Sequence, residues 1–112
     1  MTLLFRRVGA ALCLTAASAI AACSDANEPK AGTEVAVKDD QFEPRNLLVM
    51  SGQTVTWNWD GSHDHTVTFD LGGPNSTQMA TGSFQRQFTT PATYSYHCIV
   101  HGTSMAGTVV VQ

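Results

Sequence analysis

Apolar and polar residues alternate along most of the chain from residue 34 onward, as in β-strands that turn one face toward a core. Val55 and Trp57 fall on one face of the stretch 53–60, and threonines fall on the other. A two-residue period, or a short apolar run between turn signals, predicts further strands in 33–39, 46–52, 65–70, 83–90, 93–98 and 106–112. The run in 46–52 has four consecutive apolar residues, which predicts a strand covered on both faces.

Segments rich in glycine, proline, asparagine and serine separate these runs and predict turns. No segment keeps the 3.6-residue apolar period of a helix for ten residues, and the stretch 70–82 has room for one helical turn at most. Seven short strands at this spacing predict an all-β domain of the antiparallel sandwich or barrel class, over residues 34–112.

The N-terminus has a different pattern. Arg6 and Arg7 precede an uncharged run of small and apolar residues that ends at Cys23. This order is typical of an export signal, and the run of about fifteen residues is shorter than the roughly 20 that span a bilayer. Its last residues, IAAC, resemble the lipobox of bacterial lipoproteins, in which the signal is removed before a cysteine that is then acylated. The alternative is an ordinary signal, with Cys23 an incidental residue.

These features predict a signal peptide over 1–22, a lipid on Cys23 and a polar flexible linker over 23–33. The protein is then exported and lies on the periplasmic side, lipid-anchored or free. Ser24 follows the cysteine, so the aspartate that commonly retains such lipoproteins at an inner membrane is absent, and an outer membrane is the expected location.

The net charge of the chain argues against nucleic acid as a partner. The net charge of −3 becomes −5 when the signal takes away Arg6 and Arg7 and no acidic residue. The remaining basic residues do not cluster, and nucleic-acid binding depends on lysine and arginine against phosphates. We therefore expect that the protein does not bind nucleic acid. We also expect it to be a monomer.

Four side chains could bind a metal: His65 at one strand end, and Cys98, His101 and Met105 within one short segment. Cys98 would be the one free thiol of the exported chain, since Cys13 lies in the signal. Taken singly, each residue has an ordinary explanation, such as a buried apolar cysteine, a structural histidine or a core methionine. Together, a thiolate, a thioether and two imidazoles favour copper in an electron-transfer arrangement.

The stretch YSYHCIVHGTSMAGTVVV, residues 94–111, resembles the C-terminal copper loop of the cupredoxins of the plastocyanin, pseudoazurin and amicyanin group. HTVTFD resembles the segment around that family's first histidine ligand, and FEPRNLLVMSGQTVTW resembles its N-terminal half. The resemblance covers 34–112 and implies a Greek-key β-sandwich or barrel of about seven to eight strands. It also implies one type 1 copper per chain, with His65, Cys98 and His101 in a plane and Met105 as the axial ligand.

The resemblance implies a one-electron carrier whose partners are c-type cytochromes or copper oxidases. Electrons would leave at His101 through an apolar patch of Ile99, Val100 and Gly102, with Leu71 beside it. An alternative is a copper-binding, delivery or tolerance protein that uses the same ligands and releases the metal. An enzyme with a Cys98–His101 nucleophile would leave the other two candidate ligands unexplained, so we expect no enzyme activity.

The chain departs from the family pattern at several positions. Three residues separate His101 from Met105, a spacing that differs from that of plastocyanin and leaves the axial bond length open. Thr66 stands where an asparagine often supports the copper loop, and its hydroxyl could support it in part. His97 replaces a tyrosine of plastocyanin's remote electron-transfer surface. His63 is expected to be a solvated loop histidine, with a second copper site in HDH as the alternative.

Overall fold

The computed structural model describes residues 27–112 and contains nine strands in that part of the chain, with no helix. The predicted signal peptide and Cys23 lie outside the described residues. The all-β prediction is confirmed. The strands are β1 (Lys30–Ala31), β2 (Glu34–Lys38), β3 (Gln41–Glu43), β4 (Asn46–Val49), β5 (Thr54–Trp59), β6 (Thr68–Phe69), β7 (Ser83–Gln87), β8 (Ala92–Cys98) and β9 (Gly102–Val111).

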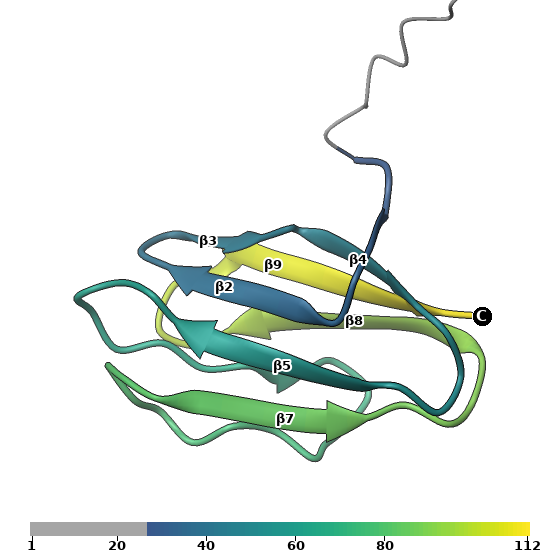
Figure 1. Ribbon diagram of the computed structural model, residues 1–112. Helices are drawn as coiled ribbons and strands as arrows, with labels where there is room; N and C mark the ends of the chain where they lie inside the picture. Colours follow the sequence, from purple (N-terminus) through teal and green to yellow (C-terminus); the bar gives the residue numbers. More distant parts are fainter. Residues whose placement is uncertain (1–26) are drawn as a thin grey trace, which may run out of the picture.

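Two sheets pack face to face as a sandwich (Figure 1). One sheet has the order β1-β4-β9-β8-β6, and the other has the order β3-β2-β5-β7. Three neighbouring pairs are parallel: β1 with β4, β2 with β5, and β4 with β9. The expected purely antiparallel arrangement is therefore wrong. Parallel neighbours arise because the chain passes from one sheet to the other between strands, and an alternating pattern carries no information on strand direction.

Two strands were not visible in the hydrophobic pattern. β3 has three residues, and β1 has two exposed residues within the predicted linker. β1 is held by its parallel pairing with Leu47 and Leu48, by a hydrogen bond from the Gly32 amide to the Leu48 carbonyl (3.2 Å), and by the side chain of Asn46, which donates to the Asn27 carbonyl (3.0 Å). The chain is thus attached to the sandwich before residue 34.

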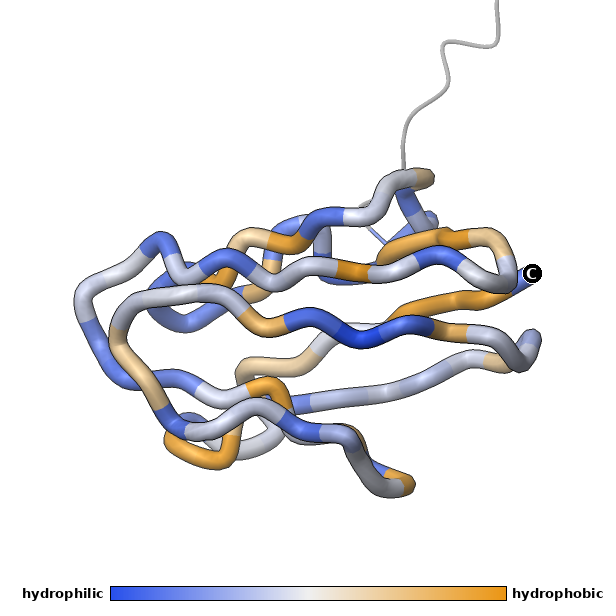
Figure 2. Tube along the Cα trace, turned by 60° about the horizontal axis from the view of Figure 1, so that its bottom comes forward, coloured by the Kyte–Doolittle hydropathy of each residue, from blue (hydrophilic) through white to orange (hydrophobic). Residues whose placement is uncertain are grey.

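The core is formed by the inward residues of both sheets, and Figure 2 shows the resulting changes between apolar and polar positions along the trace. Trp57 is fully buried at its centre, where its ring meets those of Phe69 and Tyr96 edge-on. In β4 the burial alternates, with Leu47 and Val49 buried, and Met50 beyond the strand is exposed. The prediction of a strand covered on both faces is therefore wrong, because β4 belongs to a sheet with one solvent-facing side.

The turns at one end of the sandwich bring distant segments together. The β2–β3 turn, the segment that follows β5 and the β8–β9 turn all lie at the left end in Figure 1, whereas the C-terminus lies at the opposite end. This end carries the candidate site. In residues 27–112 no helix has the length and apolar character needed to cross a membrane.

Candidate metal centre

His65 and Cys98 are brought together by a loop and a strand end that are 33 residues apart. His65 precedes β6 and is held by two backbone hydrogen bonds with Met79, at 2.9 and 3.2 Å. Cys98 is the last residue of β8. Both side chains are fully buried, and the distance from His65 Nδ1 to Cys98 Sγ is 3.8 Å. A thiol and an imidazole nitrogen therefore face each other inside the end of the sandwich.

Thr66 connects the two halves of this pair. Its backbone N–H donates to Cys98 Sγ at 3.5 Å, and its Oγ1 accepts from the Ile99 N–H at 3.0 Å. Oγ1 also lies 2.9 Å from Thr68 Oγ1. The sulfur thus accepts a backbone N–H from the segment that carries His65. Thr66 is thus hydrogen-bonded to the first residue of the β8–β9 turn, and its support of a copper loop in place of an asparagine stays a prediction.

His101 lies in the turn between β8 and β9, and its ring centroid is 5.0 Å from that of His65. The side chain is 28% exposed. Its Nδ1 is 3.8 Å from Asp40 Oδ1, and its Nε2 is buried with no hydrogen-bond partner. A buried imidazole nitrogen without a partner is an unusual feature, since buried polar atoms are nearly always hydrogen-bonded.

Met105 is fully buried in β9 and does not lie in the loop that precedes this strand. The register of β8 and β9 changes between His97, which pairs with Ala106, and Cys98, which pairs with Gly102. Residues 103–105 are therefore extra residues on the β9 side, a bulge that redirects the side chains there. The thioether is enclosed at the same end of the β8–β9 pair as Cys98.

The donor set fits copper in its chemistry: a buried thiol, a buried imidazole in contact with it, a second imidazole with an unpaired buried nitrogen, and a buried thioether. The four candidate ligands are not all arranged around one point. Within residues 27–112 no three histidine, cysteine or acidic side chains form a complete ligand group, and one nitrogen of His101 faces Asp40. The structure thus brings His65 and Cys98 together, with His101 adjacent.

Asp39 is a neighbour of the site that the sequence did not reveal. Its Oδ1 lies 3.0 Å from His65 Nε2, the ring nitrogen on the far side from Cys98. The hydrogen bond with His65, followed by those from the backbone N–H groups of Ser62 and His63, holds the pKa of Asp39 well below its ordinary value. The only signal in the sequence is general: a ligating histidine usually has a partner on its other nitrogen.

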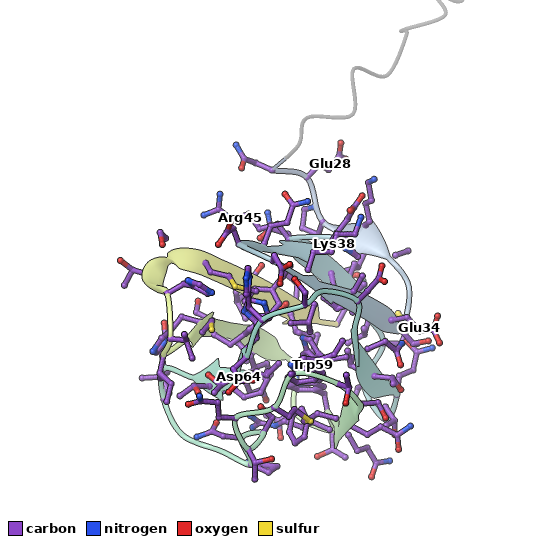
Figure 3. All side chains as sticks on the ribbon, turned by 90° about the vertical axis from the view of Figure 1, so that its left-hand side faces the viewer. Glu28, Glu34, Lys38, Arg45, Trp59 and Asp64 are labelled. Carbon is purple, nitrogen blue, oxygen red and sulfur yellow. The ribbon has the colours of Figure 1, made fainter. Side chains whose placement is uncertain are left out.

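Figure 3 views the sandwich from this end, with Asp64 of the segment between β5 and β6 labelled. The remaining candidates are exposed or partly exposed at different places on the surface. His63 is 70% exposed, as expected for a solvated loop residue, and its Nδ1 lies 3.4 Å from Asp39 Oδ1. His97 points away from Cys98, and its Nδ1 is 2.6 Å from Asp70 Oδ1. Leu71 lies beside Thr93–Ser95 of β8, so its predicted place next to His101 is wrong.

Ile99 and Val100 are 58% and 45% exposed. They occupy the β8–β9 turn together with His101. Gly102 follows with a positive φ of 64°, a conformation that glycine adopts without strain. The turn therefore presents two apolar side chains next to a partly exposed imidazole.

Comparison with known proteins identifies the family. The profile described as "Cupredoxin-like domain" matches residues 9–111, which is most of the chain. The chain belongs to this family, as its sandwich and the order of its candidate ligands indicate. Its relatives include amicyanin-alpha of Methylorubrum extorquens, which is 34% identical over 119 residues that cover 98% of both chains. Plastocyanin of Scenedesmus fuscus is 34% identical over 84 residues, covering 63% of this chain and 86% of the relative.

Solved structures show the same architecture. A purple cupredoxin from Nitrosopumilus maritimus superposes with a TM-score of 0.66 at 26% identity, over 72% of this chain and all of the other. A reduced amicyanin mutant superposes with a TM-score of 0.63 at 32% identity, over 72% of this chain and 82% of the other. A copper-containing nitrite reductase from Thermus scotoductus shares the fold alone, at 23% identity over 23% of its length.

Proposed function

We propose that this protein is a one-electron carrier that holds one copper ion with His65, Cys98, His101 and Met105. The observation that carries the proposal is the buried contact between His65 Nδ1 and Cys98 Sγ, with the Thr66 N–H directed at the sulfur. Burial of both side chains keeps water and oxidants away from the thiol. Membership of the cupredoxin family supports the same assignment.

Each residue has a distinct part in the proposed site. Cys98 and His65 are rigidly held donors on paired backbone, which limits rearrangement between two oxidation states. His101 supplies the buried nitrogen that lacks a partner. Met105 supplies a soft sulfur from the bulge of β9. Bound copper would supply the one-electron chemistry, and the hydrogen bond to sulfur would tune its potential.

Electrons would pass at the β8–β9 turn. Ile99 and Val100 are exposed in the same turn as the partly exposed His101, and Gly102 has no side chain to cover the ring. A small apolar surface with a single polar group suits a short-lived complex with a small buried interface area. We propose exported c-type cytochromes or copper oxidases as partners, with the protein on the periplasmic side and Cys23 as a lipid attachment point.

The alternative is a copper-delivery protein. The observation in its favour is that His101 faces Asp40, so this ligand could leave the metal more easily than the buried His65. The small number of methionines, four in the whole chain, argues for a carrier over a Met-rich transfer surface. The two functions differ in what leaves the protein, an electron or a copper ion.

The test of the copper site is a visible and EPR spectrum of the copper-loaded domain. We expect one Cu(II) per chain and an intense thiolate-to-copper band, which Cys98→Ser and His101→Ala should remove or strongly alter. His63→Ala is the matched control, because this histidine lies at the same end and should leave the band intact. A band that persists in Cys98→Ser would exclude the proposed site.

The test of carrier against donor uses the Cu(I) protein in two separate mixtures. Mixed with oxidised cytochrome c, a carrier should reduce the haem while keeping its copper. Mixed with an apo-protein that binds Cu(I) more tightly, it should retain its metal for hours. Metal loss within minutes together with negligible haem reduction would favour delivery.

A further inference from the structure

We infer that Asp39 is a positioning residue for His65: its carboxylate holds the imidazole with Nδ1 toward Cys98, and its negative charge favours the oxidised over the reduced metal. The inference concerns the β2–β3 turn, which contributes none of the proposed ligands. It rests on the proposed function for its effect on copper. Its effect on the histidine ring does not depend on a metal.

The first step is the hydrogen bond between the two side chains. His65 is fully buried, and its Nε2 lies 3.0 Å from Asp39 Oδ1. An ionised carboxylate only accepts hydrogen bonds, so a neutral His65 must carry its proton on Nε2. The lone pair is then on Nδ1, which faces Cys98 Sγ at 3.8 Å. The carboxylate thus selects the tautomer whose free nitrogen points at the thiol.

The second step is that Asp39 is itself fixed. Both of its carboxylate oxygens accept from the Ser62 backbone N–H at 3.1 Å, Oδ2 accepts from Ser62 Oγ at 2.9 Å, and Oδ1 accepts from the His63 N–H at 3.1 Å. These donors belong to the loop that leads directly into His65. The carboxylate is therefore bound to the loop backbone as well as to the ring.

Gly61 lies close to the Asp39 side chain and backbone. A Cβ at this position would lie 2.5 Å from Asp39 Oδ1 and 3.0 Å from the Asp39 backbone nitrogen. Any side chain would push the carboxylate away from its present place. The backbone of Gly61 has no positive φ, so the absence of a side chain is explained by space and not by backbone conformation.

These contacts have two separable consequences for a bound metal. Orientation of the ring presents Nδ1 without further rearrangement, and a carboxylate on the far nitrogen makes the imidazole a stronger donor. Loss of such a partner typically costs about 10- to 100-fold in metal affinity. A negative charge also stabilises Cu(II) more than Cu(I), so its removal should raise the midpoint potential.

The first experiment measures the ring of His65 in the metal-free protein by long-range ¹H–¹⁵N NMR. The wild type should carry its proton on Nε2. Asp39→Asn keeps an acceptor oxygen and should keep this tautomer, whereas Asp39→Ala should give a mixture. Gly61→Ala retains every charge but displaces the carboxylate, so it should also give a mixture and serves if the Asp39→Ala protein does not fold. An unchanged Nε2–H tautomer in Asp39→Ala or Gly61→Ala would overturn the positioning role.

The second experiment measures the midpoint potential of the copper-loaded proteins. Asp39→Asn should raise it, and a tenfold loss of preference for Cu(II) corresponds to about 59 mV for one electron. Asp60→Asn is the matched control, because Asp60 is exposed, lies next to Gly61 and carries the same charge. Equal shifts in the two variants would show that the bound carboxylate has no special effect.

The outcomes separate the two proposals. A wild-type protein that binds no copper would refute the proposed function, and the NMR result would still decide the role of Asp39. A normal copper spectrum together with a His65 tautomer that is insensitive to Asp39 would refute this inference alone.

Discussion

At the scale of single residues, Gly107 shows how closely the sandwich is packed behind the site. A Cβ on Gly107 would lie 2.6 Å from the Tyr96 hydroxyl and 2.7 Å from the carbonyl oxygen of Arg45. Tyr96 is buried on β8, two residues before Cys98, and burial raises the pKa of its hydroxyl above the ordinary range. The glycine two residues after Met105 therefore has a steric cause, because the tyrosine ring occupies the space of a side chain.

We expect Gly107→Ala to lower the free energy of unfolding by about 1–3 kcal/mol, since overpacking forces rings and backbone to shift. Gly32→Ala is the control, because a Cβ there meets only Leu47 Cδ1 at an ordinary 3.6 Å. Urea unfolding of the metal-free domain measures both variants. Equal stability of the two would mean that Tyr96 can move aside without cost.

The lowered pKa of Asp39 predicts how the stability of the fold depends on pH. Its pKa in the folded protein is held below the ordinary value of 3.8, so the unfolded chain binds the proton more readily. The stability contributed by Asp39 is therefore complete above that ordinary value and is lost as the pH falls from it toward the folded pKa. The wild type should exceed Asp39→Asn in stability at pH 7, and the difference should shrink by pH 3. Urea unfolding at pH 7, 5 and 3 checks this, and a difference independent of pH would contradict it.

At the scale of elements, the β8–β9 hairpin carries three of the four proposed ligands and the exposed apolar turn. Its strands pair over most of their length, and the bulge at residues 103–105 changes the register at the site. Strand pairing fixes Cys98, and Met105 is buried in the bulge of β9, whereas His101 and its neighbours lie in the turn. The hairpin thus places the sulfur donors in the buried end of the sandwich and presents the turn as a surface for a partner.

We expect Val100→Glu to slow electron transfer to oxidised cytochrome c at least about tenfold, equivalent to about 1.4 kcal/mol. The reason is that an unpaired carboxylate resists the loss of water in an apolar contact. Its spectrum and copper content should match those of the wild type. Leu71→Glu is the control, because Leu71 is also an exposed apolar residue but lies beside Thr93–Ser95. Equal slowing by both variants would indicate a general charge effect.

The hydrophobic pattern located the longer strands but not their partners. β5 and β8 follow from alternation, whereas β1 and β3 are too short to show a period. Parallel pairing depends on where the chain crosses between sheets, which no local pattern reports. Cys98 and His101 are recognisable by residue type and order. Asp39 is not, because its contact with His65 spans 26 residues and exists only once the β2–β3 turn meets the loop after β5.

At the scale of the whole molecule, one compact sandwich has its candidate site at one end, and the chain enters at the edge strand β1 (Figure 1). The proposed removal of Arg6 and Arg7 with a signal peptide would change the net charge from −3 to −5, and such an acidic protein would attract a basic partner at low salt. The proposed lipid on Cys23 would restrict the search for such a partner to a membrane surface.

We expect Cys23→Ala to move the protein from the membrane fraction to the soluble fraction of its host, because the variant lacks the acylated sulfur. Fractionation followed by immunoblotting measures the distribution. Cys13→Ala is the control, since this cysteine lies within the predicted signal and should not change it. The same distribution for Cys23→Ala and wild type would exclude lipid attachment at this residue.

The short strand β1 has a mechanical consequence for such an anchored protein. It is fastened to β4 by two paired positions and a few hydrogen bonds near Asn27 and Gly32. A pull from the N-terminal side would load this fastening before any strand of the core. Its release would free residues 27–32 and lengthen the connection to the anchor by up to about 20 Å, with β2 and the site end intact. The distance between the domain and its anchor point would then depend on whether β1 is paired with β4.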